Sequence, residues 1–108
     1  MRYRANNHWG NHFWGLIHTI TIIDFESNEM YNNNIKNILM NLQNVFPCHS
    51  CKYLYTEYLK QLDNMDMSKS MVLFYWSVDL HNTVNKKLNK EEWTYEKALE
   101  KWTYKVEG

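Results

Sequence analysis

The stretch at residues 46–51 reads Phe46-Pro47-Cys48-His49-Ser50-Cys51, and it holds both cysteines of the 108-residue chain. In a helix, thiols with this C-x-x-C spacing lie one turn apart on the same face, near enough to form a disulfide. Pro47 suits the first turn of a helix, where its missing N–H is not needed. A thiol at a helix N-terminus has a lowered pKa because unpaired N–H groups stabilise the thiolate. The stretch therefore predicts a reactive dithiol at the start of a helix.

The cysteines have two other uses to weigh. A disulfide across so short a loop adds little to the stability of a fold. A zinc site is conceivable because His49 lies inside the motif and His8 and His12 are spaced i, i+4, but there is no second C-x-x-C and two histidines must come from far away. We favour redox chemistry, and keep as the alternative a small helical zinc-binding or redox-scaffold module that uses Cys48, Cys51 and histidines.

The composition favours an all-α fold. The chain has only 3 Gly and 1 Pro, too few for strands joined by tight turns, and long stretches follow a 3.6-residue period. We expect helices over about 8–23, 29–45, from the dithiol to about 62, 69–88 and 95–105, with Ile35, Ile38 and Leu39 on the apolar face of the second. Ser68 and Thr94 are candidate N-caps, and Asn89 suits a left-handed helix stop. We treat residues 1–108 as a single domain.

Charge and hydropathy exclude several classes of function. Lys plus Arg and Asp plus Glu both number 12, so the net charge is zero, unlike the basic excess of a nucleic-acid or anionic-membrane surface. No apolar run reaches the length of a membrane helix. Residues 1–7 lack the apolar core of a secretory signal. We therefore expect no targeting signal and a cytoplasmic location.

A polar patch interrupts the fourth expected helix. His81 and Asn85 are spaced i, i+4 and share a face, with Asn82 beside them. Asparagine is a poor residue for a helix interior, and buried amides need partners. A solvated face is the simplest interpretation, but Val84 and Leu88 on the same side place the patch near the core. A buried ligand rich in donors and acceptors explains both features.

The first expected helix carries an aromatic stretch, Trp9-Gly10-Asn11-His12-Phe13-Trp14, with His18 one turn after Trp14. A tryptophan and a histidine one turn apart form a wall that stacks on a flat ring. Gly10 permits the close approach of a ligand or of another helix. Taken alone, this pattern is more typical of ordinary helix packing with one hydrogen-bonded histidine in the core.

Together these segments resemble the Erv/ALR family of FAD-linked sulfhydryl oxidases over about residues 8–103. The resemblance rests on W-x-x-x-H, P-C-x-x-C and a later W-x-x-x-x-H-N-x-V-N-x-x-L, followed by two tryptophans. In this sequence the pattern falls on Trp14, His18, Pro47, Cys48, Cys51, Trp76, His81, Asn82, Val84, Asn85, Leu88, Trp93 and Trp102.

The resemblance implies a four-helix bundle with a short fifth helix, which holds FAD in the bundle mouth and forms a homodimer. It places Cys51 against the flavin ring and makes Cys48 the sulfur that substrate attacks. Lys87 and Lys90 would meet the pyrophosphate of FAD, and Trp93, Trp102 and His81 would surround its adenine. The cofactor-binding residues so implied are Gly10, Asn11, Trp14, His18, His81, Asn82, Val84, Asn85, Lys87, Leu88, Lys90, Trp93 and Trp102, with no metal ligand.

The implied enzyme is a thiol oxidase that forms disulfides in partner proteins. Electrons would pass from a substrate dithiol, in a thioredoxin-like protein, through Cys48 and Cys51 to FAD and then to dioxygen, giving hydrogen peroxide. The chain has no cysteines for a shuttle disulfide, and Val78 and Tyr95 stand where a disulfide often joins the last two helices. In this it resembles the short members encoded by large cytoplasmic DNA viruses, which implies a host cytoplasm or a virion as the location.

Overall fold

The computed structural model describes residues 9–23, 29–46 and 49–103, and these segments are helical apart from their connections. The α-helices are α1 (Trp9–Ile22), α2 (Glu29–Leu42), α3 (His49–Leu59), α4 (Val72–Lys87) and α5 (Tyr95–Trp102). Short 3-10 turns extend α2 as η1 (Gln43–Val45) and α3 as η2 (Lys60–Asn64). The predicted all-α architecture, four longer helices and a short fifth, is confirmed.

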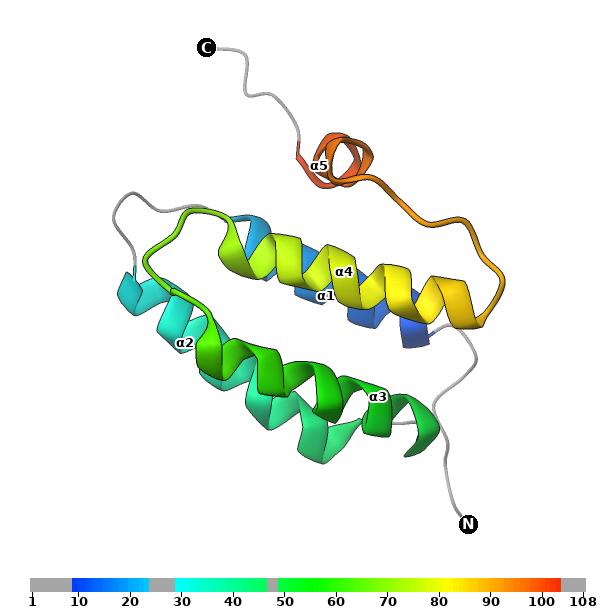
Figure 1. Ribbon diagram of the computed structural model, residues 1–108, viewed down its shortest axis with the longest axis horizontal. Coiled ribbons are helices and arrows are strands. Elements are labelled where there is room, and N and C mark those ends of the chain that lie inside the picture. The colour runs from blue at the N-terminus through cyan, green and yellow to red at the C-terminus, as the bar shows by residue number, and fades with distance from the viewer. Residues whose placement is uncertain (1–8, 24–28, 47–48, 104–108) are drawn as a thin grey trace.

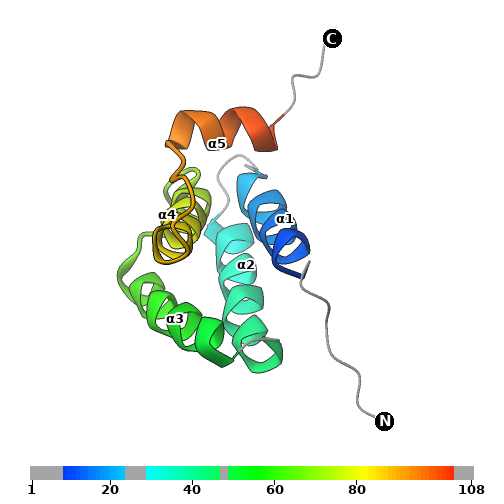
Figure 2. The ribbon, with the colours of Figure 1, turned by 90° about the vertical axis from the view of Figure 1, so that its right-hand side faces the viewer.

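The helices are arranged in pairs. Helix α1 packs along α4, while α2 lies beside α3 on the other side of the bundle (Figure 1). Helix α5 lies across α1 and α4 and contacts both of these helices, on the side away from α2 and α3 (Figure 2). Helix α4 is therefore covered on two sides, by the bundle and by α5.

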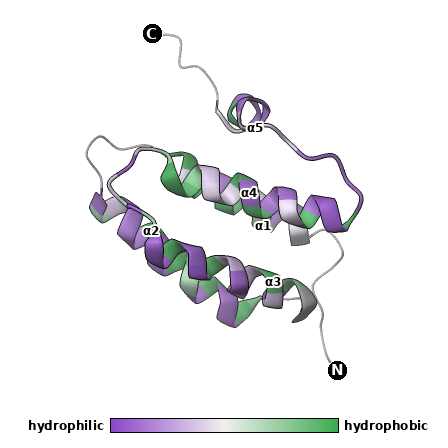
Figure 3. Ribbon diagram, viewed as in Figure 1, coloured by the Kyte–Doolittle hydropathy of each residue, from purple (hydrophilic) through white to green (hydrophobic). Residues whose placement is uncertain are grey.

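Two apolar clusters meet on α4. The larger cluster, in the bundle interior, contains Leu73, Trp76 and Leu80 of α4 with buried residues of the other long helices. The smaller cluster joins Phe74 and Val78 of α4 to Ala98 of α5. Hydrophobic and hydrophilic residues alternate around α2 and α3, as expected for helices with one buried face (Figure 3).

On α2, the apolar stripe is narrower than the sequence predicts. Ile35 and Leu39 are buried as predicted, with exposures of 6% and 0%, but Ile38 is 47% exposed and its predicted core position is wrong. Residues 35 and 39 are spaced i, i+4 and share one line along the helix, whereas residue 38 lies to the side of that line. Ile38 thus belongs to the outer surface of the bundle.

Helix α4 begins three residues later than predicted, and the predicted cap at Ser68 is wrong. The backbone N–H of Ser68 donates to Asp66 Oδ1 at 2.9 Å, and its hydroxyl donates to the same oxygen. This local turn competes with helix formation. The chain then passes through Met71, whose φ of 62° is left-handed, before α4 starts at Val72.

The C-terminus of α4 is a Schellman stop centred on Asn89. Its φ is 56°, as predicted for a left-handed residue, and the N–H of Lys90 donates to the carbonyl of Asn85 at 2.8 Å. The N–H of Asn89 donates to the carbonyl of Lys86 at 3.3 Å. The predicted cap of α5 is also confirmed, because Thr94 Oγ1 accepts from the N–H of Lys97 at 3.1 Å. Both ends fix the connection that joins α4 to α5.

The stop at Asn89 can be tested by substitution. We expect Asn89→Gly to keep or raise the free energy of unfolding, and Asn89→Val to lower it by about 1 kcal/mol or more, because only glycine adopts a positive φ without strain. Urea unfolding measures both changes. Asn33→Val on the exposed side of α2 is the matched control, since valine and asparagine have similar helix propensities. Equal losses for the two valine variants would contradict the prediction.

Candidate functional site

A cavity of about 420 Å³ lies at the end of the bundle where α1 and α3 begin and α4 ends. This volume is within the range of small-molecule sites in proteins. The lining residues are Trp9, Gly10, Asn11, Phe13, Trp14, Phe46, Cys51, Tyr55, Leu80, His81, Val84, Asn85, Leu88 and Lys90. We call this space the main cavity.

The main cavity brings together one of the two cysteines and most of the predicted binding residues. Cys51 is the third residue of α3, so it lies in the first turn of that helix as predicted. Cys48 lies outside the described residues. Eight of the predicted cofactor-binding residues line the same cavity, namely Gly10, Asn11, Trp14, His81, Val84, Asn85, Leu88 and Lys90.

Flat aromatic groups form much of the cavity wall. The rings of Trp14 and His81 are stacked, with centroids 3.9 Å apart and planes at 6°. On the α3 side, Phe46 packs against Phe13 at 4.7 Å and against Tyr55 at 4.9 Å. Leu80, Val84 and Leu88 add apolar surface, and Lys90 supplies a positive charge at the edge. Such a cavity suits a planar ring system that carries an anionic group.

Five lining residues were not among the predicted site residues, namely Trp9, Phe13, Phe46, Tyr55 and Leu80. Spacing offers a clue for two of them. Tyr55 follows Cys51 by four residues and therefore lies on the same face of α3, and Phe13 follows Trp9 by four residues on α1. The other members of this group carry no comparable pattern, because apolar residues at helical spacing are most often plain core.

A second, smaller hollow lies on the α5 side of His81. Its lining includes four further predicted residues, His18, Asn82, Trp93 and Trp102, and also Lys101, which the sequence analysis missed. Its volume is about 20 Å³, room for little more than a water molecule. His81 lines both spaces. Lys87 is exposed and lines neither of them.

His18, which is buried, and His81, which is partly buried, form a hydrogen-bonded pair. Nε2 of His18 lies 2.9 Å from Nδ1 of His81, and only 2% of His18 is exposed. Burial, with smaller repulsions from His81 and Lys101, lowers the pKa of His18 to about 3. Burial, with repulsion from Lys101 and Lys90, lowers the pKa of His81 to about 4. Both imidazoles are therefore neutral at pH 7.

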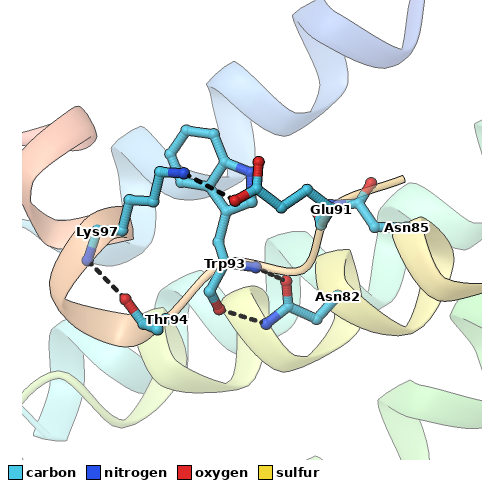
Figure 4. A network of polar contacts seen from close by, with 6 residues as sticks. All are labelled: Asn82, Asn85, Glu91, Trp93, Thr94 and Lys97. Atoms are coloured by element: carbon cyan, nitrogen blue, oxygen red, sulfur yellow. Dashed lines mark hydrogen bonds and ion pairs between the residues drawn. The ribbon is translucent and has the colours of Figure 1, made fainter. Parts of the chain in front are cut away.

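The amide of Asn82 holds the connection between α4 and α5 (Figure 4). Its Nδ2 donates to the carbonyl of Trp93 at 2.7 Å, and its Oδ1 accepts from the N–H of Trp93 at 2.7 Å. Asn85 donates to the carbonyl of Glu91 at 3.2 Å. Asn82 thus positions Trp93 beside the second hollow through the backbone.

Contacts between side chains also join α5 to α4. The hydroxyl of Tyr95 donates to Asp79 Oδ1 at 2.6 Å, and Val78 is buried in the cluster with Ala98. The ammonium groups of Lys97 and Lys101 lie 5.0 and 4.7 Å from the centre of the Trp93 ring. Val78 and Tyr95, which stand at the positions where the resemblance led us to look for a disulfide, thus join α5 to α4 by packing and by a hydrogen bond.

A metal centre finds no support in residues 9–23, 29–46 and 49–103. No group of three or more His, Cys, Asp or Glu side chains in these segments is arranged to hold a metal ion. No helix in the same segments is long and apolar enough to cross a membrane.

Comparison with known proteins now identifies the family. The sequence pattern of the Erv1/Alr family matches residues 11–103, and the chain belongs to this family. It is similar to an FAD-linked sulfhydryl oxidase of African swine fever virus, with 30% identity over 86 residues that cover 78% of this chain and 71% of the relative. It is also similar to a probable FAD-linked sulfhydryl oxidase of Acanthamoeba polyphaga mimivirus, with 26% identity over 96 residues that cover 85% and 66% of the two chains.

Solved structures confirm the fold. The crystal structure of the yeast Erv1 core superposes with a TM-score of 0.73 at 20% identity, covering 94% of this chain and 86% of that one. The FAD-binding domain of Erv1 from Saccharomyces cerevisiae gives a TM-score of 0.73 at 21% identity, covering 93% and 95%. The bundle with a short crossing fifth helix is therefore the fold of this family.

The histidine pair makes stability depend on pH. The folded-state pKa values of His18 and His81 lie below the usual 6.5. As the pH falls from 6.5 to 4, the unfolded chain therefore binds more protons at these histidines than the folded chain does, and folding becomes less favourable. We expect the free energy of unfolding to fall by on the order of 2 kcal/mol for each of the two histidines over this range. Urea unfolding at several pH values measures it.

His18→Gln should flatten that pH dependence, whereas His12→Gln, on the exposed side of α1, should leave it unchanged. The same slope for wild type and His18→Gln would show that this buried imidazole does not cause the acid sensitivity.

The Asn82 contacts predict a local effect on the α4–α5 connection. Asn82→Ala removes two hydrogen bonds, and we expect a loss of about 1–3 kcal/mol in unfolding free energy together with faster hydrogen exchange at the Trp93 N–H. Asn82→Asp should restore only the contact with that N–H. Asn41→Ala, at an exposed site on α2, is the control. Unchanged exchange at Trp93 in Asn82→Ala would refute the positioning role.

Proposed function

We propose that this chain is an FAD-dependent thiol oxidase that forms disulfide bonds in partner proteins. One observation carries the proposal: Cys51 lines the same main cavity as the stacked Trp14 and His81. A sulfur beside an aromatic-walled space is the arrangement that a dithiol needs to exchange electrons with a bound ring. Membership of the Erv1/Alr family and relatives named FAD-linked sulfhydryl oxidase support the same activity.

The cavity residues fit a flavin nucleotide by their chemistry. Trp14 and His81 offer flat surface to a ring, while Asn11 and Asn85 offer amide groups. Lys90 would hold the pyrophosphate, and exposed Lys87 near the end of α4 would add a second positive charge. His18, Asn82, Trp93 and Trp102 would form or position the adenine side, where the second hollow must widen to admit a base.

The cysteines would carry the thiol chemistry. A substrate thiolate attacks Cys48 of the Cys48–Cys51 disulfide, a mixed disulfide forms, and Cys51 leaves as the thiolate. A second thiolate of the substrate then attacks the mixed disulfide, so that the substrate becomes oxidised and the cysteine pair reduced. The chemistry that bound FAD supplies is reoxidation of this pair, with transfer of two electrons to dioxygen and release of hydrogen peroxide.

The proposal extends to partners and location. The substrate is a dithiol protein of thioredoxin-like type, which reaches Cys48 directly because the 108 residues hold no further cysteine to act as a shuttle. A homodimer is supported by exposed apolar side chains on the first two helices, Leu16 at 48%, Met30 at 74% and Ile38 at 47%. The viral relatives favour a host cytoplasm or a virion as the location, with residues 1–108 working as one domain.

The purified chain provides the test. We expect a yellow protein with the visible absorption of bound flavin, which consumes oxygen when given dithiothreitol. Cys51→Ser should keep the flavin but lose turnover by about two orders of magnitude or more, because the electron route from the thiols is cut.

Tyr53→Ser is the matched control, since Tyr53 lies two residues further on the same helix and is 71% exposed. It should oxidise dithiothreitol normally. A colourless protein that binds no added FAD would overturn the proposed activity, and normal turnover by Cys51→Ser would overturn the role given to that sulfur.

A further inference from the structure

A buried hydroxyl on α4, that of Ser77, contacts His18 of the histidine pair. Oγ of Ser77 lies 2.9 Å from Nδ1 of His18, and Ser77 is fully buried. His18 in turn contacts His81 through its other ring nitrogen, at 2.9 Å. The three side chains form a line of polar contacts from Ser77 through His18 to His81, which lines both hollows.

The two hydroxyl groups nearest His18 already donate their protons to backbone carbonyl oxygens. Ser77 Oγ lies 2.6 Å from the carbonyl oxygen of Phe74, a contact that requires the hydroxyl to donate because a carbonyl has no proton. Thr21 Oγ1, 3.4 Å from Ser77 Oγ, lies 2.7 Å from the carbonyl oxygen of Ile17 and donates there by the same reasoning. Neither hydroxyl has a proton left for His18.

The proton between Ser77 and His18 must therefore belong to His18 Nδ1. A neutral imidazole carries one proton, so His18 Nε2 is bare and accepts from Nδ1–H of His81. His81 is neutral as well, which leaves its own Nε2 bare. Among the described residues none hydrogen-bonds to that atom, and the charged groups that act on the pair, Lys101 and Lys90, are both positive and oppose a further proton.

We infer that Ser77 is a positioning residue that fixes the protons of His18 and His81, so that His81 offers its bare Nε2 as an acceptor to an N–H or O–H group of the flavin nucleotide. The identity of the ligand rests on the proposed function, whereas the proton positions rest on the contacts alone. Trp14 stacked on His81 holds the imidazole plane, and Ser77 determines which of its nitrogens is protonated.

Loss of the Ser77 hydroxyl would leave His18 Nδ1–H buried without an acceptor. The hydrogen bond between the two histidines would then reverse. The proton of His18 would move from Nδ1 to Nε2 and be donated to His81 Nδ1, and the single proton of His81 would move from Nδ1 to Nε2. Nε2 of His81 would then present an N–H donor to the ligand in place of a bare acceptor nitrogen. The cost of restoring the original arrangement on binding should weaken FAD affinity by about 5- to 150-fold.

Long-range proton–nitrogen correlation spectra of the full chain read the protonation of each ring nitrogen directly. We expect His18 and His81 to be protonated on Nδ1 in the wild type and His81 to shift toward Nε2 protonation in Ser77→Ala, with weaker FAD binding measured by equilibrium dialysis. Ser77→Thr should keep the wild-type protonation pattern because threonine keeps the hydroxyl.

Thr21→Val is the matched control, since it removes a buried hydroxyl that lies 3.4 Å from Ser77 Oγ but donates elsewhere. It should change neither the nitrogen pattern nor the affinity. Nε2 protonation of His81 in the wild type, which needs no variant to fold, would overturn the inference, as would an unchanged pattern in folded Ser77→Ala. If no variant binds FAD, the proposed function and the ligand named here both fail, yet the spectra still decide the role of Ser77.

Discussion

The hydrogen bonds of His18 are the constraint on which the rest of the site depends. His18 is a polar ring buried between α1 and α4, and a buried polar ring needs partners for its nitrogens. Ser77 satisfies one nitrogen and His81 the other, each at 2.9 Å. Because both partners lie on α4, one side chain fixes how α1 packs along that helix. The same contacts turn His81 toward Trp14, so the wall of the main cavity follows from a requirement of the core.

Helix α4 can supply this wall because it is buried on more than one side. Leu73, Trp76 and Leu80 face the bundle, while Phe74 and Val78 face α5. Ser77 lies between these two faces and meets α1. A helix with a single apolar stripe would leave one of its sides in water. Here the covering by α5 shields the second hollow, and the Asn82 amide keeps the connection to α5 in place (Figure 4).

Particular residues show how far sequence reasoning reached. The helical period and the scarcity of glycine and proline indicated the all-α bundle, and Thr94 and Asn89 marked helix ends correctly because caps and stops are local chemistry. The predicted cap at Ser68 was wrong because Ser68 hydrogen-bonds to Asp66 in a local turn. The predicted core position of Ile38 was wrong because neighbouring helices cover only a narrow stripe of α2. Phe46 and Leu80 were not predicted to line the cavity because their sequence pattern is that of ordinary core.

The sequence by itself determined the helical class, the position of Cys51 in the first turn of α3, and the set of side chains able to bind a flat ligand, because these depend on residue type and near-neighbour spacing. Only the tertiary structure decided which of those side chains share one space. It brought Trp14 onto His81 across 67 positions of sequence, and it engaged Asn82 with the backbone of Trp93. It also made Ser77 a partner of His18, because contacts between distant helices depend on how their surfaces pack and on where each buried polar atom finds its partner.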